Sequence, residues 1–238
     1  MKNVVQFSGG KDSTAMLLLL LERGVTVDEI IFCDTGMEFP ELYRHIEKVK
    51  EYIDRPITVL KPEHNFEYYL SEIVIQKGAN AGKCGYGWPR LWHRWCTRAF
   101  KERLTRKYLK EKYACEEYKL FIGIAADEPL RHYRELPKNV EHPLFDWNIT
   151  EADALRYCQS KGFDFGGLYE RFRRLGCWCC PLQRLDSLRT LRRYYPELWQ
   201  ELLRLDAKAP YTFLKRYSAA DLEEKFALEE ARENYFSV

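Results

Sequence analysis

Two strand–turn–helix units follow one another at the start of the chain, and they constrain its fold more than any other feature. Residues 4–7 form a short apolar run that ends at a glycine pair, and residues 13–23 are a leucine-rich segment of helical character. Residues 29–33 are a second apolar run, and a helix with apolar residues at helical spacing begins at Pro40. Such alternation of strands and helices predicts a parallel sheet with helices on both faces.

Two further apolar runs, at residues 57–60 and 120–125, extend the predicted sheet. Their hydrophobicity is continuous rather than alternating, which is typical of strands that are buried on both faces. We therefore expect an α/β fold with a doubly wound, Rossmann-like parallel sheet, whose ligands bind beyond the carboxyl ends of the strands. Residues 182–236 show two or three helices and no strand pattern. The predicted domains are an α/β domain with a cysteine-rich loop over 1–180 and a helical C-terminal extension over 181–238.

The composition excludes several classes of protein. The chain has 238 residues, 46% of them hydrophobic, and its 38 basic and 36 acidic residues nearly balance, which is unlike a disordered chain. No apolar run approaches the roughly 18 residues of a membrane-spanning helix, and the first residues lack the features of a signal peptide. We therefore expect a cytoplasmic protein with no membrane partner. In that reducing compartment the eight cysteines are expected to serve metal binding, catalysis or burial rather than disulfides.

The turn between the first predicted strand and helix has the composition of an anion-binding loop. Its residues are Ser8, Gly9, Gly10, Lys11, Asp12 and Ser13. Glycines let backbone N–H groups approach an anion, and the following helix places partial positive charge at its N-terminus. The lysine adds a full charge, and the serines add hydroxyl donors. The spacing is not that of the Walker loop, and an ordinary turn would explain the glycines but not the other residues together.

This loop resembles the pyrophosphate loop of the ATP pyrophosphatase superfamily, also called the PP-loop or adenine nucleotide alpha hydrolase-like superfamily. Three further motifs are similar to those of its phosphoadenosine phosphosulfate (PAPS) reductase family. They are the DTG segment at residues 33–41, the strand end at residues 123–131, and the PL-x-x-W, LY and GC-x-x-CP order over residues 142–181. The strand end departs from the family at two positions, since Ala125 stands where an arginine is usual and Pro129 where a serine is.

The resemblance implies that an adenine nucleotide, either ATP or PAPS or adenylyl sulfate, binds at the carboxyl edge of the sheet. By position, the glycine and serine residues of the loop would bind its phosphates, and Lys11 and Asp12 would have catalytic roles. The other implied nucleotide contacts follow the second and fourth strands: Asp34, Thr35, Gly36, Gly123, Asp127 and Arg131. A helix-capping or turn-capping role for Asp34 stays open.

A second group of candidate residues is a cysteine-rich loop that ends in a proline. Cys177, Cys179 and Cys180 lie on this loop and Cys96 lies upstream, and several thiolates in such a pattern favour a soft metal or an iron–sulfur cluster. Family members that carry a 4Fe-4S cluster use a cysteine pair and then C-x-x-C, whereas this chain has one upstream cysteine. The resemblance implies these four cysteines as ligands of a 4Fe-4S cluster, and a structural zinc is the alternative.

The remaining cysteines have other expected roles. Cys33, Cys115 and Cys158 lie in apolar strand or helix sequence, and we expect them to be buried core residues. Cys84 lies in a glycine-rich loop and is expected to be exposed, where it could act as a ligand or as a nucleophilic thiol.

Basic residues are dense in residues 90–107 and 171–193, although the formal net charge is only +2. Such a local positive field favours anionic ligands, and we expect Arg94 and Arg98, one helical turn apart, to hold phosphate or sulfate groups of the substrate. A solvated helix face would explain part of these charges without a ligand. A polyanionic acceptor such as tRNA or DNA is a further expectation. Three tryptophans are available for stacking on its bases: Trp88, Trp92 and Trp95.

Two departures from the PAPS reductases decide the expected reaction. Those reductases use a cysteine in the C-terminal tail, and residues 181–238 contain none. They also commonly lack the loop lysine, which is present here. We therefore expect an enzyme that cleaves ATP between its α and β phosphates with Mg²⁺ and adenylylates an acceptor for iron–sulfur-linked sulfur transfer. Other expected partners are a reductant or sulfur donor protein, and a homodimer stays open.

Two other functions stay open. The first is a sulfonucleotide reductase that acts on PAPS or adenylyl sulfate with Cys84 or another internal thiol as the nucleophile. The second is a non-catalytic nucleotide-sensing or redox-sensing module that keeps the site without turnover.

Overall fold

The computed structural model describes residues 1–133 and 137–236 of the chain. These residues form two compact units, which are described separately. The first, called the sheet unit, comprises Met1–Asp34, Glu38–Pro62 and Ala99–Glu170. The second, called the cysteine unit, comprises Thr35–Met37, Glu63–Arg98 and Arg171–Val238. Residues 63–98 fall within the first predicted domain, but they group with the C-terminal region in the structure.

The sheet unit contains a five-stranded parallel sheet in the order β3-β2-β1-β4-β5. Its strands are β1 (Lys2–Phe7), β2 (Glu29–Cys33), β3 (Thr58–Leu60), β4 (Tyr118–Ile122) and β5 (Val140–Glu141). Val5 at the centre pairs with Ile30 on one side and with Phe121 on the other. The strand order reverses between β1 and β4, which is where ligands bind in such sheets. The predicted doubly wound parallel sheet is confirmed.

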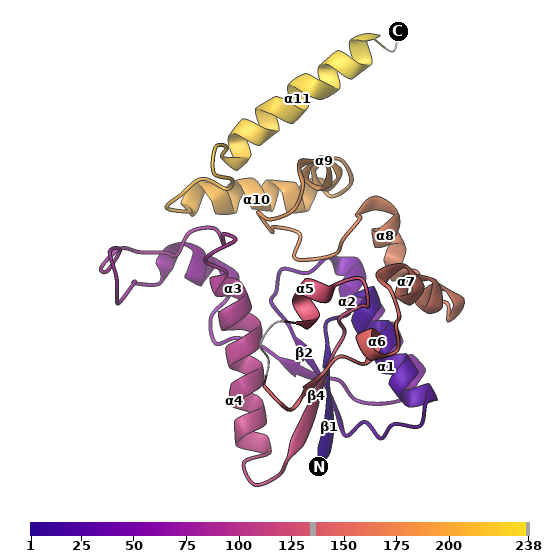
Figure 1. Cartoon of the computed structure of the whole chain (residues 1–238). Helices are drawn as coiled ribbons and strands as arrows, with labels where there is room; N and C mark the ends of the chain where they lie inside the picture. The colour runs from indigo at the N-terminus through magenta and orange to yellow at the C-terminus, as the bar shows by residue number, and fades with distance from the viewer. Residues whose placement is uncertain (134–136, 237–238) are drawn as a thin grey trace. The chain divides into compact units, whose positions relative to one another are not determined.

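Helices cover both faces of this sheet. α4 (Arg103–Lys112) lies on one side, and α1 (Lys11–Glu22) and α7 (Glu151–Ser160) pack against each other on the opposite side (Figure 1). All five residues of β2 are buried. The burial predicted for residues 57–60 was wrong, because β3 lies at the edge of the sheet and its Val59 is 47% exposed. The other helices of this part of the chain are α2 (Pro40–Ile53), α5 (Pro129–His132), α6 (Pro143–Asp146) and α8 (Leu168–Arg171), with a 3₁₀ turn at Phe165–Gly167.

Several boundaries differ from the predictions. β4 ends at Ile122 rather than at residue 125, because the chain beyond it leaves the ladder and the N–H of Ala126 donates to the carbonyl of Ile149 at 2.8 Å. β5 is absent from the predictions because two residues carry no periodic signal. The helix predicted over residues 95–112 consists of α3 (Trp95–Thr97), a π-helical turn (Arg98–Glu102) and α4.

The cysteine unit contains the predicted C-terminal helices, α9 (Leu185–Tyr194), α10 (Pro196–Lys208) and α11 (Ala219–Phe236), and a π-helical turn at Tyr68–Glu72. Arg192 ties α9 to α11, since its guanidinium donates to both carboxylate oxygens of Glu223 at 2.9 and 3.0 Å. The indole nitrogen of buried Trp88 donates to Asp206 at 2.7 Å, which fixes residues 63–98 to α10. None of the helices in the described ranges is long and apolar enough to cross a membrane.

Candidate nucleotide site

The loop between β1 and α1 has the backbone of an anion-binding turn. Gly9 has a φ of +76°, and a Cβ there would lie 3.0 Å from the side chain of Ile46, so only glycine fits without strain. Gly10 is the N-cap of α1 and has no side chain of its own to cap the first turn. The first N–H groups of α1 and its positive dipole end therefore point to the carboxyl edge of the sheet, where an anion would bind.

The two serines of the loop hold its shape. The Ser13 hydroxyl donates to the carbonyl of Gly10 at 3.0 Å and accepts a hydrogen bond from the N–H of Ser8 at 3.1 Å. The Ser8 hydroxyl lies 3.0 Å from that of Ser13. Since Ser13 gives its proton to the loop itself, Ser8, which is exposed, is the serine with a hydroxyl better placed to reach a ligand. The phosphate contacts of both serines stay a prediction.

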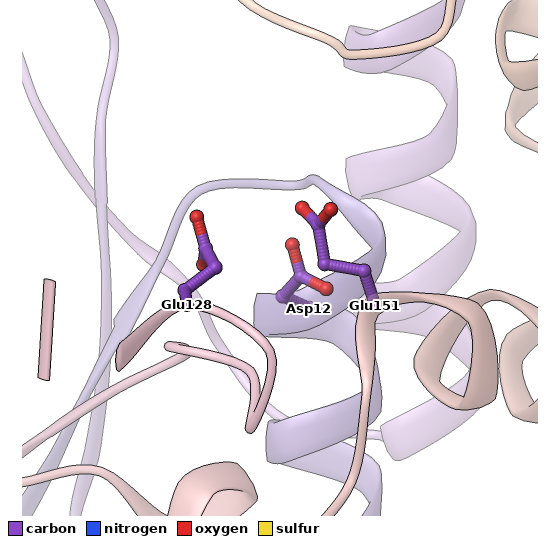
Figure 2. A group of neighbouring side chains, drawn as sticks. All are labelled: Asp12, Glu128 and Glu151. Carbon is purple, nitrogen blue, oxygen red and sulfur yellow. The ribbon is translucent and has the colours of Figure 1, made fainter. Parts of the chain in front are cut away.

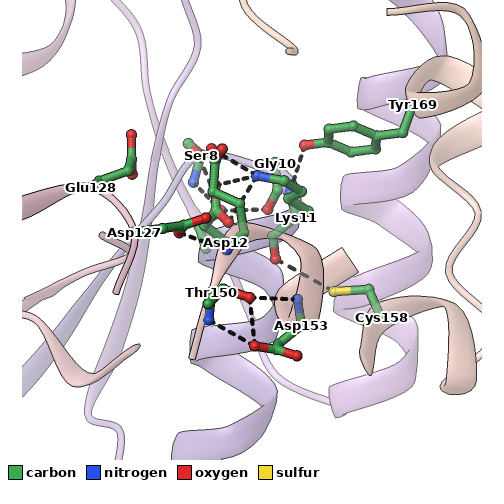
Figure 3. A network of polar contacts seen from close by, with 12 residues as sticks. Ser8, Gly10, Lys11, Asp12, Asp127, Glu128, Thr150, Asp153, Cys158 and Tyr169 are labelled. Carbon is green, nitrogen blue, oxygen red and sulfur yellow. Dashed lines mark hydrogen bonds and ion pairs between the residues drawn. The ribbon is translucent and has the colours of Figure 1, made fainter. Parts of the chain in front are cut away.

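Lys11 is buried at the start of α1 with its ammonium group among carboxylates (Figure 3). Its Nζ lies 3.0 Å from both carboxylate oxygens of Asp12 and 3.0 Å from Oε1 of Glu151. Its backbone N–H donates to the hydroxyl of Tyr169 at 2.8 Å. A buried ammonium needs such partners because burial without them would be costly. The ammonium charge is therefore held between two carboxylates at the N-terminus of α1.

Asp12, Glu128 and Glu151 bring three carboxylates together beside this lysine (Figure 2). One oxygen from each lies within 4.8 Å of the other two, which is a spacing that one cation can bridge. Burial raises the pKa of Asp12, an effect that the Lys11 charge opposes. Hard oxygen ligands of this kind suit Mg²⁺. The donor set therefore fits the magnesium ion that a nucleotide phosphate would bring.

Neighbouring residues position two of these carboxylates. Glu151 is the first residue of α7, and its N–H donates to Oδ1 of Asp127 at 2.9 Å. Glu128 follows β4 and accepts two hydrogen bonds from Arg131, both at 2.7 Å. Asp127 and Arg131, which the resemblance implies as nucleotide contacts, thus hold acidic residues in place in this structure. Their contacts with a nucleotide stay a prediction.

The capping box predicted at the start of α7 is confirmed. The Thr150 side chain accepts from the Asp153 N–H at 3.2 Å, and the Asp153 carboxylate accepts from the Thr150 N–H at 3.1 Å. This box fixes where α7 begins and therefore where Glu151 lies.

Gly123 is required by close packing. A Cβ at this position would lie 2.9 Å from the backbone nitrogen of Ser13 and 3.0 Å from the carbonyl carbon of Asp12. The end of β4 therefore approaches the first turn of α1 at backbone distance. Glycine here lets the chain after β4 pack directly against the first turn of α1 at the site.

The predicted nucleotide contacts after β2 fall in different units. Asp34 belongs to the sheet unit, where it accepts from the Tyr43 hydroxyl at 2.7 Å and lies 3.6 Å from the Lys61 ammonium. Thr35 belongs to the cysteine unit, and its hydroxyl oxygen accepts from the Met37 N–H at 3.2 Å and lies 3.8 Å from the Cys177 sulfur. Gly36 has a φ of +72°, which favours glycine.

The cysteine-rich loop packs on this DTG segment inside the cysteine unit. The N–H of Trp178 donates to the carbonyl of Met37 at 3.1 Å. Cys179 is buried, and burial raises the pKa of the Cys180 thiol. The charges of Arg94 and Arg174 counteract part of that rise, while the nearby Cys96 adds to it. Upstream and downstream cysteines thus lie within electrostatic range of each other beside basic residues.

Thiolates of this set suit a soft metal or an iron–sulfur cluster by their chemistry. In the described residues, no three cysteine sulfurs all lie within 4.8 Å of one another, which is the spacing expected around a single ion such as zinc. The assignment of Cys96, Cys177, Cys179 and Cys180 as ligands stays a prediction.

The structure shows which of the other four cysteines are buried. Cys33 and Cys158 are buried as predicted, and burial raises the pKa of Cys158 to about 12, so its thiol stays neutral and donates to the carbonyl of Lys11 at 3.4 Å. The prediction for Cys115 was wrong: it is exposed, because α4 ends at Lys112 and Cys115 lies in the turn before β4. Cys84 is exposed as predicted.

Arg94 and Arg98 are exposed, and the N–H of Arg98 donates to the carbonyl of Arg94 at 3.4 Å, so they lie one helical turn apart as predicted. Their role toward an anion stays a prediction. Of the three tryptophans expected to stack on bases, Trp88 and Trp95 are buried and that expectation is wrong for them, since they form the core of the cysteine unit. Trp92 is 93% exposed.

Comparison with known proteins identifies the family. The profile of the phosphoadenosine phosphosulfate reductase domain matches residues 2–183. The chain belongs to this family. Two uncharacterised proteins of Methanocaldococcus jannaschii are 29% and 27% identical to it, each over 83% of the chain and over 40% and 46% of their own lengths. An uncharacterised nin region protein of Escherichia phage lambda is 33% identical over 55% of the chain and half of its own length. The chain therefore spans half or less of these curated relatives.

Two solved structures are similar to the chain. A phosphoadenylyl-sulfate reductase from Candida auris in a phosphate complex has 18% identity and a TM-score of 0.49, with 75% of this chain and 82% of that chain covered. The U34-tRNA thiolase NcsA from Methanococcus maripaludis with its 4Fe-4S cluster has 19% identity and a TM-score of 0.45, with 86% and 70% covered.

Three residues of this member of the PAPS reductase domain family belong to the site without having been predicted there: Glu128, Glu151 and Tyr169. Glu128 lies within the third motif, next to Asp127, and a second acid at a strand end was a usable signal. Glu151 is a first-turn acid behind the capping residue, where it looks like an ordinary helix-end charge. Tyr169 is the tyrosine of the LY motif, which was a usable signal, although the motif does not reveal its contact with the loop.

Proposed function

We propose that the chain cleaves ATP between the α and β phosphates and transfers AMP to an acceptor. The observation that carries this proposal is the position of the Lys11 ammonium, buried at the N-terminus of α1 and 3.0 Å from Asp12 and from Glu151. A lysine there is suited to the β and γ phosphates, which a nucleotide monophosphate or an adenylyl sulfate does not have. Membership in the PAPS reductase domain family supports an adenine nucleotide as the ligand.

In this reaction an oxygen or other nucleophile of the acceptor attacks the α phosphorus. A bond forms between acceptor and phosphorus, and the bond from that phosphorus to the bridging oxygen of pyrophosphate breaks. Negative charge develops on the leaving pyrophosphate. The fixed charge of Lys11 and the N–H groups of α1 lie on the side where that charge would appear, so they would stabilise the transition state more than the ground state.

Asp12, Glu128 and Glu151 would hold a magnesium ion bound to the nucleotide phosphates. Such an ion supplies Lewis-acid stabilisation of phosphoryl oxygens. The three carboxylates place negative charge close to an anionic ligand, so without a cation they would repel it. In the absence of the cation, Arg131 keeps Glu128 oriented and Lys11 keeps Glu151 oriented.

Cys96, Cys177, Cys179 and Cys180 would hold a 4Fe-4S cluster, which would supply a place to hold or pass the sulfur atom. The acceptor would then be activated for sulfur delivery, with a donor protein or reductant as the further partner. The adenylylation and the sulfur transfer are separable claims, because the first rests on the sheet unit and the second on the cysteine unit.

The test is pyrophosphate release from ATP and Mg²⁺ by purified protein, in the presence of single-stranded RNA and DNA oligonucleotides as trial acceptors. Replacing Lys11→Met should lower release by a factor on the order of 100 or more. The matched control is Lys50→Met on α2, a half-exposed lysine that pairs only with Glu47 among the described residues and should leave release unchanged. Equal release from the Lys11 variant and the wild type would refute the proposal, and tight ATP binding without release in the wild type would favour a binding module.

A second candidate function is favoured by the family match, which is to a sulfonucleotide reductase domain. An exposed thiol such as Cys84 would attack the sulfate sulfur of PAPS or adenylyl sulfate, release the nucleotide and become an S-sulfocysteine. A dithiol reductant would then release sulfite. Sulfite formation from either sulfonucleotide with thioredoxin, lost in Cys84→Ser, would establish this function instead.

A further inference from the structure

A tight turn in the cysteine unit presents a tryptophan to solvent. Trp92 is 93% exposed and its neighbour Leu91 is 64% exposed. On either side of them, Arg90 and His93 exchange backbone hydrogen bonds of 3.2 and 3.0 Å. A single exposed apolar residue is ordinary, but two at the tip of a closed turn are a surface feature that calls for a ligand-based explanation.

Both ends of this turn are anchored. The guanidinium of Arg90 donates to the carbonyls of Thr212 and Phe213 at 2.6 and 3.1 Å. After the turn, Trp95 is buried against Phe66, with ring centroids 5.0 Å apart, and its indole nitrogen donates to the carbonyl of Gly87 at 2.9 Å. The turn is therefore held in place before any ligand arrives. A ring presented this way loses little conformational entropy on binding, because a tryptophan has only two side-chain torsions.

The sequence on both sides of the turn is basic and contains no acidic residue. Residues 73–98 contain no aspartate or glutamate, and they contain Lys77, Lys83, Arg90, Arg94 and Arg98. A second stretch of the same unit, residues 171–185, has four arginines and no acid. With a formal net charge of +2 for the whole chain, these segments make a local positive field.

Three arginines on the helices of this unit are already neutralised by acidic partners. Arg189, Arg192 and Arg204 each form ion pairs with glutamates. Among the described residues, Arg94 and Arg98 form no ion pair with a carboxylate, and both are exposed. Their charges are therefore available to a phosphate, whereas those of Arg189, Arg192 and Arg204 are already compensated.

We propose that the surface formed by Leu91, Trp92, Arg94 and Arg98, here called the Trp92 surface, binds a single-stranded nucleic acid. The indole would stack on a base, and the two arginines would contact adjacent phosphates. Aromatic platforms flanked by cations are how proteins bind single strands without reading their sequence. A second copy of the chain fits this surface poorly, because it would bring one set of uncompensated arginines against another.

This inference deepens the proposed function and rests on it in one respect. The bound strand would be the acceptor of the proposed reaction. Binding itself involves residues of the cysteine unit only. Arg94 is also one of the charges that act on the Cys180 thiol, so a strand on the Trp92 surface would lie near the cysteine loop.

The test is fluorescence anisotropy with labelled oligonucleotides of about 12 nucleotides, single-stranded RNA and DNA and a duplex of the same sequence, on the full chain at about 0.1 M salt. Trp92→Ala should weaken single-strand binding roughly tenfold to a hundredfold, and Trp92→Phe should keep most of it. Arg98→Gln should reduce the slope of log affinity against log salt by about 0.7. The matched control is Arg232→Gln, which removes one exposed charge from the acidic helix α11 and should leave the slope unchanged.

Four results would overturn the proposal: unchanged binding by Trp92→Ala, duplex binding as tight as single-strand binding, no oligonucleotide binding by the wild type even at low salt, or conversion of a wild-type dimer to a monomer by Trp92→Ala. Tighter binding of RNA or of DNA would identify which of the two nucleic acids the Trp92 surface binds. Oligonucleotide binding by Lys11→Met should equal that of the wild type. If the wild type binds the strand but releases no pyrophosphate, the proposed ATP cleavage fails and the Trp92 surface stands. If the wild type releases pyrophosphate but binds no strand, the Trp92 surface alone fails.

Discussion

The hydroxyl of Tyr169 accepts a hydrogen bond from the backbone N–H of Lys11 at 2.8 Å. This N–H is the first of helix α1, where no capping side chain is present. The tyrosine thus does for the loop what a capping residue does for an ordinary helix. Burial raises the pKa of its hydroxyl, so it stays neutral across the physiological range.

Removing this acceptor should destabilise the sheet unit. Tyr169→Phe leaves the Lys11 N–H without its partner, and we expect a loss of roughly 0.5–1.5 kcal/mol in the free energy of unfolding. Urea denaturation measures it. The control is Tyr52→Phe on α2, where the side chain is about half-exposed and the change should stay within a few tenths of a kcal/mol. Equal losses in the two variants would show that the Tyr169 hydroxyl has no special role.

Gly123→Ala should separate the end of β4 from the first turn of α1. The added Cβ would lie 2.9 Å from the Ser13 nitrogen, and backbone cannot move away as a flexible side chain can. We expect a loss of roughly 1–3 kcal/mol in the free energy of unfolding, with a weaker affinity for ATP.

The control for this change is Gly176→Ala, where a Cβ would meet nothing within 4 Å. That variant should unfold at nearly the wild-type urea concentration. An alanine at position 123 that is tolerated as well as one at 176 would mean that the close approach of β4 to α1 is not required.

Much of the fold follows from the sequence. The strand predicted over residues 29–33 is β2, which is buried at every residue, whereas the run at residues 57–60 forms the edge strand β3 and is only partly buried. The grouping of residues 63–98 with the C-terminal helices was not predictable, because it depends on long-range contacts such as the bond from Trp88 to Asp206. A hydrophobic pattern indicates which residues are buried, but it does not indicate which residues they pack against.

Some residues of the candidate site could likewise be predicted from the sequence, and others could not. The phosphate loop could be located because its glycines and lysine are adjacent in sequence. Glu151 could not, since it reaches Lys11 from 140 residues away and looks like a common first-turn acid. Trp88 and Trp95 show the opposite failure: their closeness to basic residues indicated a ligand surface, whereas both rings pack inside the cysteine unit.

Asp12→Asn should make the protein more stable while abolishing magnesium-dependent pyrophosphate release. Burial raises the pKa of Asp12 above its ordinary value of 3.8. Between that value and the raised one, the folded state holds a proton that the unfolded state has lost, so stability falls as pH rises through this window. At neutral pH the penalty is complete, and asparagine removes it. The gain measured by urea denaturation should shrink as the pH is lowered toward 4.

Asp28→Asn is the control of opposite sign. The N–H of Asn3 lowers the pKa of Asp28, so its ionised form contributes stability that is present above its ordinary value of 3.8. This variant should be less stable than the wild type at neutral pH. A destabilised Asp12→Asn at neutral pH would contradict the assigned direction.

Cys180→Ser should reduce the iron content of protein purified without oxygen, together with the absorption of an iron–sulfur cluster near 400 nm, to about a tenth or less of the wild-type value. The matched control is Cys115→Ser, which replaces an exposed cysteine of the sheet unit and should leave the iron unchanged. Zinc in place of iron in the wild type would support a structural site, and equal metal in both variants would exclude Cys180 as a ligand.

The central claim is that Lys11 serves the β and γ phosphates of ATP, and calorimetric titration with ATP and with AMP in Mg²⁺ tests it without an acceptor. The wild type should bind ATP roughly ten times or more as tightly as AMP, because a charged hydrogen bond to phosphate is worth about 1.5–3 kcal/mol. Lys11→Met should lose that preference and keep its affinity for AMP. Equal affinity of the wild type for ATP and AMP, or tighter binding of adenylyl sulfate than of ATP, would contradict the account.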